Sequence, residues 1–164
     1  MKKQKGFSLI ELLIVVAIIL IIAAIAIPNL IRSKMAANEA SAVASLRTIN
    51  TAEVVYSSTY SVPNVFAANL TSLSDGGTPA ACTGTAVPTS TAACLIDSAL
   101  AAAVSTTVSK SGYSFTYTPA VGVYSVLAAP VAPNSTGVRQ FFTDQTAVIR
   151  QNAGAAATAS STPI

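Results

Sequence analysis

The chain has 164 residues and contains neither histidine nor tryptophan, so catalysis by imidazole and histidine-ligated zinc sites are excluded. Only 9% of the residues are charged, 52% are hydrophobic and the mean hydropathy is +0.60, a composition typical of a chain that is bound to a membrane or packs much of its surface against other protein. The formal net charge of +3 comes from Lys2, Lys3 and Lys5, because the other basic residues balance the acidic ones. No cation cluster lies beyond this leader, and no nucleic-acid site is evident.

A run of apolar residues, 12–27, follows the basic leader and ends before Pro28. As a helix it spans about 24 Å, short of a ~30 Å hydrocarbon core; residues 7–31 are long enough but include Glu11 and Asn29. Two interpretations compete: a cleaved secretory signal peptide, and a retained membrane helix with its lysine-rich end in the cytoplasm. The alanines near the end of the run make a weak signal-peptidase site, which favours retention. An acid such as Glu11 costs about 2.5–3.5 kcal/mol at mid-bilayer, so it either lies near the headgroups or awaits a cationic partner.

Residues 5–12 read KGFSLIEL. Followed by the apolar run, they resemble the prepilin signature of type IV pilins and type II secretion pseudopilins. The resemblance implies cleavage between Gly6 and Phe7 on the cytoplasmic side by a prepilin peptidase, followed by N-methylation of Phe7. It also implies that the apolar helix stays attached, as membrane anchor and later as filament core, and that the helix bends or melts in the filament near Pro28.

The same resemblance implies that Glu11 meets the N-terminal amine of a neighbouring subunit. A buried carboxylate is tolerated when a cation is paired with it, and the amine of Phe7 is a cation at the same end of the helix. Within one straight helix the two groups are held in a fixed relation. A neighbour shifted along the axis can place its amine on Glu11 with better geometry, so assembly would relieve the acid and set the axial register.

The helix is expected to continue through Asn29 to about Ser58, with Leu46, Ile49 and Tyr56 on one packed face. The opposite side is expected to carry Arg32, Lys34, Glu39 and Arg47. Residues 60–64 read as a turn, residues 65–73 as a short helix and residues 74–94 as a loop rich in Gly, Pro, Ser and Thr. A second short helix is predicted over residues 95–108, with Asp97 near its start.

Cys82 and Cys94 are the only cysteines. Their spacing excludes a CxxC redox centre, and a metal site is disfavoured because histidine and a second cysteine pair are missing. In an extracytoplasmic location a disulfide is the default, and a ring of this size is worth roughly 3 kcal/mol. Many members of the resembling family place their cysteine pair later, around the last strands.

Alternating aromatic and hydroxyl residues at 113–118 predict a strand whose aromatic face packs on the long helix. A turn over 119–122 and further strands over 123–127, 138–142 and 147–150 follow, and residues 151–164 are expected to be a mobile low-complexity tail. The expected fold is α+β: a long N-terminal helix packed on a small antiparallel, roughly four-stranded sheet. The expected divisions are a leader (1–6), a membrane and filament-core helix (7–31), an extracytoplasmic headgroup (32–150) and the tail (151–164).

Since no catalytic constellation or phosphate loop is visible, the leading hypothesis is a structural one. The chain would be a type IV pilin, held in the inner membrane with its N-terminus in the cytoplasm, and polymerised with identical copies into a surface fibre for adhesion, motility or DNA uptake. Its expected partners are the prepilin peptidase and N-methyltransferase and an inner-membrane assembly platform with its ATPase; no cofactor is expected. The alternative is a major pseudopilin of type II secretion, forming a periplasmic piston, but those proteins usually hold calcium in an acidic loop, where this chain offers only Asp144. A soluble binding or enzymatic domain on a simple anchor leaves KGFSLIEL unexplained.

Overall fold

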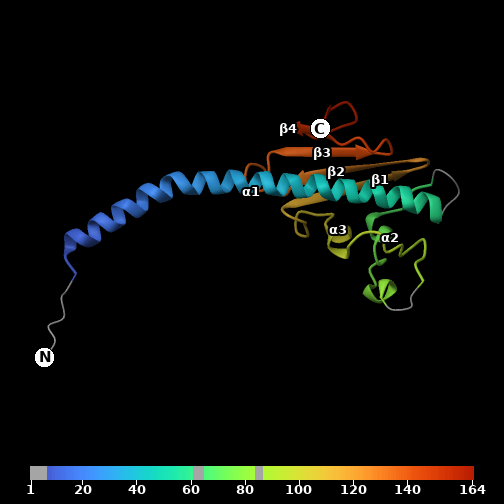
Figure 1. Cartoon of the computed structure of the whole chain (residues 1–164). Helices are drawn as coiled ribbons and strands as arrows, with labels where there is room; N and C mark the ends of the chain where they lie inside the picture. Colours follow the sequence, from blue (N-terminus) through green and yellow to red (C-terminus); the bar gives the residue numbers. More distant parts are fainter. Residues whose placement is uncertain (1–6, 61–64, 84–86) are drawn as a thin grey trace. The chain divides into compact units, whose positions relative to one another are not determined.

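A computed structural model describes residues 7–60, 65–83 and 87–164. The leader with Gly6, and most of the turn predicted over 60–64, lie outside these residues. The chain forms two compact units, Met1–Lys34 and Met35–Ile164. In chain order the elements are α1 (Leu9–Thr59), α2 (Leu70–Leu73), the 3-10 helix η1 (Pro79–Cys82), α3 (Ser98–Ala102), β1 (Tyr113–Ala120), β2 (Val123–Pro130), β3 (Arg139–Asp144), β4 (Arg150–Ala153) and β5 (Thr162–Pro163) (Figure 1).

Helix α1 is continuous over 51 residues, about 77 Å at 1.5 Å per residue. Within the second unit it buries one face, including the predicted Leu46, Ile49 and Tyr56, at helical spacing. The expectation for Glu39 is wrong, because its side chain is buried on the packed face rather than exposed on the opposite one. The reason is long-range: Glu39 binds residues about one hundred positions further along the chain.

The sheet is antiparallel throughout, in the order β1-β2-β3-β4-β5, and its strands run alongside the second-unit part of α1 (Figure 1). The α+β class is confirmed, and the sheet has one strand more than predicted. The core combines α1 with the aromatic face of the sheet, where Tyr113, Phe115 and Phe141 are almost fully buried. The predicted packing of the aromatic strand is therefore confirmed.

The first hairpin turns later than predicted, since β1 continues through Pro119 to Ala120 and only Val121 and Gly122 form the loop. Strand β1 lies at the edge of the sheet, and the Phe115 N–H donates to the Ala103 carbonyl instead of to β2. Pro119 is an even number of residues from Phe115, so its missing N–H faces the same outer edge and removes no bond to β2. Gly122 has φ +73°, which a residue without Cβ adopts freely.

The C-terminal segment also differs from expectation, because residues 151–153 and 162–163 form strands of the sheet where a mobile tail is predicted. The predicted strand over 147–150 is displaced: Asp144 Oδ1 accepts the Thr146 N–H at 2.9 Å and Ala147 has φ +58°, so this stretch turns and β4 begins only at Arg150. Backbone pairing with β3 and β5 then holds polar residues that show no strand pattern.

The two short helices are shorter than predicted, and each begins later than predicted because a side chain caps its N-terminus. Asn69 accepts the Ser72 N–H at 2.8 Å and starts α2, and Asp97 accepts the Leu100 N–H at 3.1 Å and starts α3. After Ala102 the chain leaves the helix, and the Ala103 carbonyl accepts the Phe115 N–H of β1. Asp97 thus lies at the predicted helix start, but the helix ends at Ala102 and residues 103–108 are not helical.

Candidate functional site

The first turn of α1 holds the two described residues of the predicted processing and assembly site. Phe7 precedes the helix and is 83% exposed. The Ser8 N–H donates to Glu11 Oε2 at 2.9 Å, which is the acidic half of a capping box in which the residue at the third helical position binds back to the N-cap. Glu11 therefore has a role inside its own chain that the sequence analysis missed, although the S-x-x-E spacing of Ser8 and Glu11 signals it.

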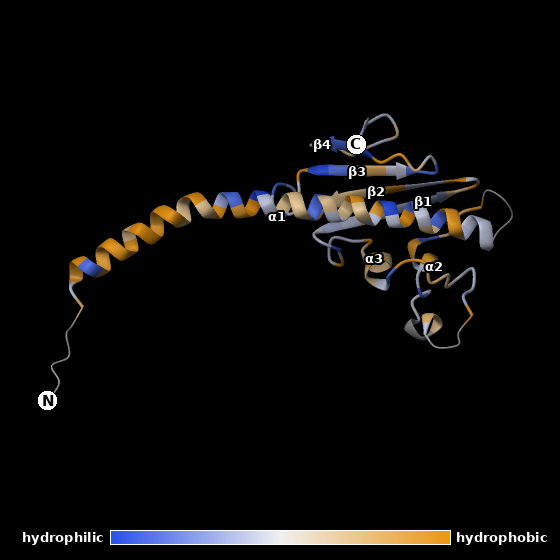
Figure 2. Ribbon diagram, in the orientation of Figure 1, coloured by the Kyte–Doolittle hydropathy of each residue, from blue (hydrophilic) through white to orange (hydrophobic). Residues whose placement is uncertain are grey.

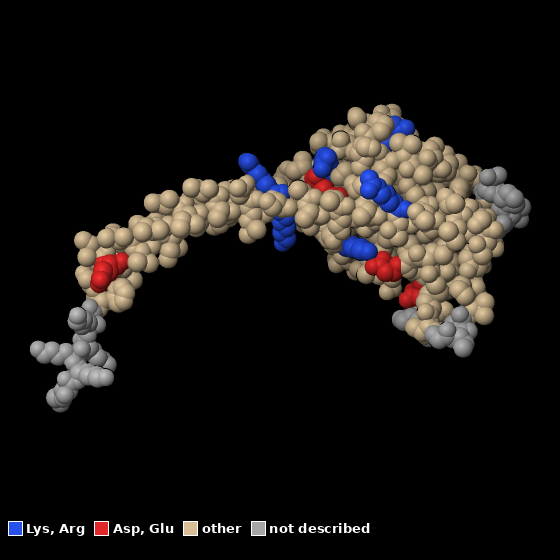
Figure 3. All heavy atoms as spheres, in the orientation of Figure 1, with Lys and Arg blue, Asp and Glu red and all other residues tan. Residues whose placement is uncertain are grey.

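The helix beyond this turn is apolar on every side. All the large aliphatic side chains of residues 12–27 are exposed, and the ribbon of this stretch is coloured almost entirely as hydrophobic in Figure 2. No charged residue occurs between Glu11 and Arg32, as the uncharged segment in Figure 3 shows. By length and composition α1 can cross a membrane. A helix that is hydrophobic all round requires lipid or protein around it.

Pro28 lies inside α1 without ending it. Because proline has no N–H, it cannot donate to the carbonyl four residues earlier, and the helix lacks one backbone hydrogen bond there. One turn later the Ser33 hydroxyl donates to the Asn29 carbonyl at 3.0 Å. The missing bond makes this point easier to bend, but the bend itself remains a prediction.

In the second unit, Glu39 clamps α1 to the start of β3. Its Oε1 accepts the N–H groups of Val138 and Arg139 at 2.9 and 3.1 Å, and its Oε2 accepts Arg139 Nε at 2.7 Å. Arg139 Nη1 also donates to Gln151 of β4 at 2.7 Å. Burial alone would raise the pKa of Glu39, but these hydrogen bonds and the arginine charge hold it below its ordinary value of 4.5.

A polar network crosses the core further along α1. Tyr124 donates to Asn50 Oδ1 at 2.9 Å, and Asn50 Nδ2 donates to the Thr143 hydroxyl at 2.9 Å. These bonds join α1 to β2 and β3, which gives the helix one register on the sheet. All buried side-chain nitrogen and oxygen atoms of the described residues have a partner.

Cys82 and Cys94 form a disulfide, with Cα atoms 5.6 Å apart. Cys94 also donates its backbone N–H to the Ser74 carbonyl at 2.8 Å and has φ +58°. The bridge closes the loop between η1 and α3 and lies in the second unit. Phe7 and Glu11 therefore both lie at the N-terminal end of α1, whereas Pro28 and the cysteine pair are separate features.

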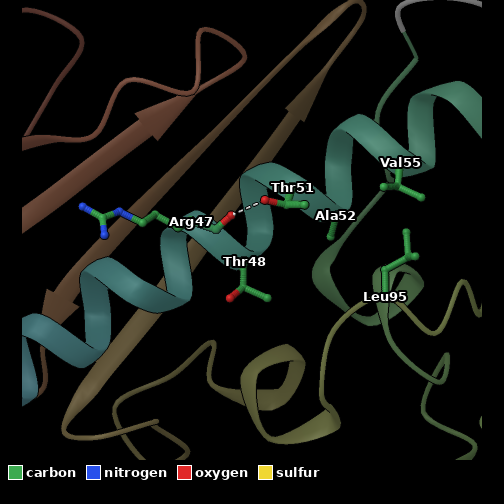
Figure 4. Close-up of a pocket in the computed structure, with 6 residues that line it drawn as sticks. All are labelled: Arg47, Thr48, Thr51, Ala52, Val55 and Leu95. Atoms are coloured by element: carbon green, nitrogen blue, oxygen red, sulfur yellow. Dashed lines mark hydrogen bonds between the residues drawn. The ribbon is translucent and has the colours of Figure 1, made fainter.

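A pocket of about 440 Å³ lies against α1 and is lined by Arg47, Thr48, Thr51, Ala52, Val55 and Leu95 (Figure 4). The Thr51 hydroxyl already donates to the Arg47 carbonyl at 3.0 Å, and the arginine side chain points away from the other lining side chains (Figure 4). No acid, thiol or second titratable group joins Arg47 in the lining. Within the described ranges, no group of His, Cys, Asp and Glu residues has the arrangement of a metal site.

Comparison with known proteins places the resemblance at the N-terminus. Residues 1–27 match the family described as "Prokaryotic N-terminal methylation motif". The chain is 59% identical over 39 residues to the type IV wide pilus major component PilA4 of Thermus thermophilus, and 49% identical over 51 residues to the type IV major pilin protein PilA of Myxococcus xanthus.

These matches cover 24% and 31% of this chain but only 30% and 23% of the relatives' own lengths. No solved structure matches the chain. Both relatives are pilins, and they do not favour the pseudopilin alternative. The resemblance to type IV pilins that KGFSLIEL predicts is therefore confirmed, and it rests on the N-terminal segment of the chain.

Proposed function

We propose that this protein is a structural subunit of a type IV pilus, which polymerises with copies of itself through the N-terminal half of α1. Prepilin peptidase would cut between Gly6 and Phe7 and methylate the new Phe7 amine. The subunit would wait in the inner membrane with its N-terminus in the cytoplasm, until an assembly platform and its ATPase add it to a surface fibre. Its role is mechanical, not enzymatic.

The observation that carries this proposal is the apolar surface of residues 12–27, whose large aliphatic side chains are all exposed. Lipid covers that surface while the subunit is held in the membrane, and the same surface on neighbouring copies covers it in a filament. Burial in either case gains about 25 cal/mol per Å² of apolar area removed from water. A helix built this way can change environment without exposing apolar surface to water.

The presence of Glu11 distinguishes a helix that assembles with copies of itself from a simple membrane anchor. Its carboxylate has a backbone partner in Ser8, but no ion pair is formed by it among the described residues. The negative charge is left for a cation outside the subunit, and the N-terminal amine of a neighbouring copy supplies one. In a lone anchor the acid would contribute only its capping bond to Ser8, and its charge would remain costly beside the membrane.

Two substitutions at Glu11 separate its charge from its capping bond. Glu11→Gln keeps an oxygen that can accept the Ser8 N–H, whereas Glu11→Ala removes both the acceptor and the charge. If the charge is what assembly needs, both variants lose nearly all surface fibres in cells that lack the unmodified gene, while both insert into the membrane normally. Mass spectrometry should find both cut before methylated Phe7. Fibres at normal abundance in the Gln variant would show that helix capping is sufficient and would overturn the pairing argument.

A further inference from the structure

The buried carboxyl of Glu53 closes a ring of hydrogen-bonding groups in the core of the second unit. Glu53, on α1, is fully buried. Its Oε1 lies 2.6 Å from the Tyr117 hydroxyl of β1, and its Oε2 accepts the Ala67 N–H at 3.1 Å. The same Tyr117 hydroxyl lies 2.8 Å from the Ala67 carbonyl oxygen. One carboxyl, one phenol and the backbone N–H and C=O of one residue therefore meet in three contacts.

Counting protons decides the charge of the ring. A phenol has a single hydrogen to donate. If Glu53 is ionised, the Tyr117 hydroxyl faces two oxygens that can only accept, and it can form a full hydrogen bond with one of them. If Glu53 carries a proton, it donates to Tyr117, Tyr117 donates to the Ala67 carbonyl, and the Ala67 N–H donates to Oε2. Only the protonated form satisfies all three contacts.

The surroundings of the carboxyl agree with a neutral acid. The titratable groups that face it are tyrosines: Tyr117 from β1, Tyr124 from β2 and Tyr56 from α1 itself. None of the ion pairs of the described residues includes Glu53. Burial raises the pKa of Glu53, and the hydrogen bonds from Tyr117 and Ala67 offset part of that rise. An unpaired buried charge costs several kcal/mol, so the protonated carboxyl is the state of lower free energy.

We propose that Glu53 is a neutral carboxylic acid at neutral pH, and that its proton holds the segment Val65–Ala67 against α1 and β1 as a pH-sensitive latch. Ala67 is fully buried by this arrangement, and Phe66 beside it packs edge-on against Tyr124 with ring centroids 4.8 Å apart. Removing the proton would leave a buried anion, and the ring could keep only two of its three bonds. The segment would then loosen, because exposing Glu53 to water is the way to solvate that anion.

Infrared difference spectroscopy of the full chain in detergent micelles tests the charge directly. A protonated carboxyl has a carbonyl stretching band that a carboxylate lacks. At pH 7 the spectrum of Glu53→Gln subtracted from that of the unchanged protein should show one acid band, since other carboxyls, Glu11 included, cancel. The matched control Glu39→Gln should show none, because Glu39 is paired with Arg139 and ionised. A carboxylate band in the Glu53 difference spectrum at pH 7 would overturn the proposal.

Hydrogen exchange of the Ala67 amide tests the latch. In the unchanged protein its protection should fall at least tenfold as Glu53 titrates, after correction for the base-catalysed intrinsic rate. Glu53→Gln can donate to Tyr117 and accept from Ala67 as the neutral acid does, so its protection should stay constant over the same range. A second variant, Tyr117→Phe, should shift the acid band to higher frequency because the Glu53 O–H loses its acceptor. Equal pH dependence in the unchanged protein and Glu53→Gln, or an unshifted acid region in Tyr117→Phe, would refute the mechanism.

Discussion

Replacing Glu39 by alanine should destabilise the headgroup by about 3 kcal/mol, because the carboxylate is the acceptor for two backbone N–H groups at the start of β3. These two bonds are part-buried; a hydrogen bond to a charged group contributes about 1.5–3 kcal/mol, and water can replace part of that contribution here. Arg139 adds less, since 44% of its side chain is exposed and water can replace the lost ion pair. Glu39→Gln keeps one acceptor oxygen and should lose about 1–2 kcal/mol.

Thermal or denaturant unfolding of the full chain in detergent, followed by tyrosine fluorescence, measures these differences. For a domain of this size 3 kcal/mol lowers the midpoint by roughly 10 °C. Arg139→Gln is the informative comparison, because it removes the ion pair and leaves both backbone bonds to Glu39 in place. It should cost less than Glu39→Ala. If Arg139→Gln lost more stability than Glu39→Ala, or if Glu39→Ala lost less than about 1 kcal/mol, the backbone hydrogen bonds would not be the source of the stability that Glu39 provides.

The same clamp has a defined pH dependence. The pKa of Glu39 lies below its ordinary value of 4.5, so the folded state holds the proton less tightly than the unfolded state. The stability that the ionised carboxylate contributes is complete above that value, and it is lost as the pH falls through the folded-state pKa. Glu39→Gln should therefore lose less stability than the unchanged protein on acidification below pH 4.5, and parallel acid profiles of the two would contradict this linkage.

Two further predictions concern the rest of the headgroup. The double change Cys82→Ser and Cys94→Ser should lower the free energy of unfolding by about 3 kcal/mol, since the bridge spans a sequence separation of 12 and restrains the unfolded loop. Any fibre defect should follow subunit abundance and be milder than that of Glu11→Ala. Free labelling of both thiols in the native protein would show that no bridge exists. Gly137→Ala should cost about 1–3 kcal/mol in the same unfolding assay, because a Cβ there would overlap the buried Tyr113 hydroxyl, and Gly137→Ala combined with Tyr113→Phe should recover part of the loss.

Local sequence patterns predict those elements whose stability is local or periodic. The apolar run and the Leu46, Ile49 and Tyr56 spacing define α1, and the alternation at 113–118 defines β1. Strands β4 and β5 could not be predicted in this way, because the β4 residues Arg150–Ala153 have neither alternation nor β-branched side chains and β5 has only two residues. Strand β4 forms by pairing with β3, and β5 forms by pairing with β4. The clamp of Glu39 joins residues 99 and 100 positions apart, and no pattern within one segment can reveal such a contact.

The three glutamates of the chain all lie on α1, and the carboxyl group of each has a different set of hydrogen-bond and charge partners. Glu39 has an arginine and two backbone donors, so its charge is neutralised within the subunit. Glu53 has a phenol and a peptide group, whose hydrogen-bonding capacity is satisfied when the acid is neutral. Glu11 has one backbone N–H and, among the described residues, no counter-charge. The first two acids are satisfied within the subunit, so Glu11 is the remaining acid of α1, and it has no counter-charge among the described residues, as the proposed pairing with the amine of a neighbouring copy requires.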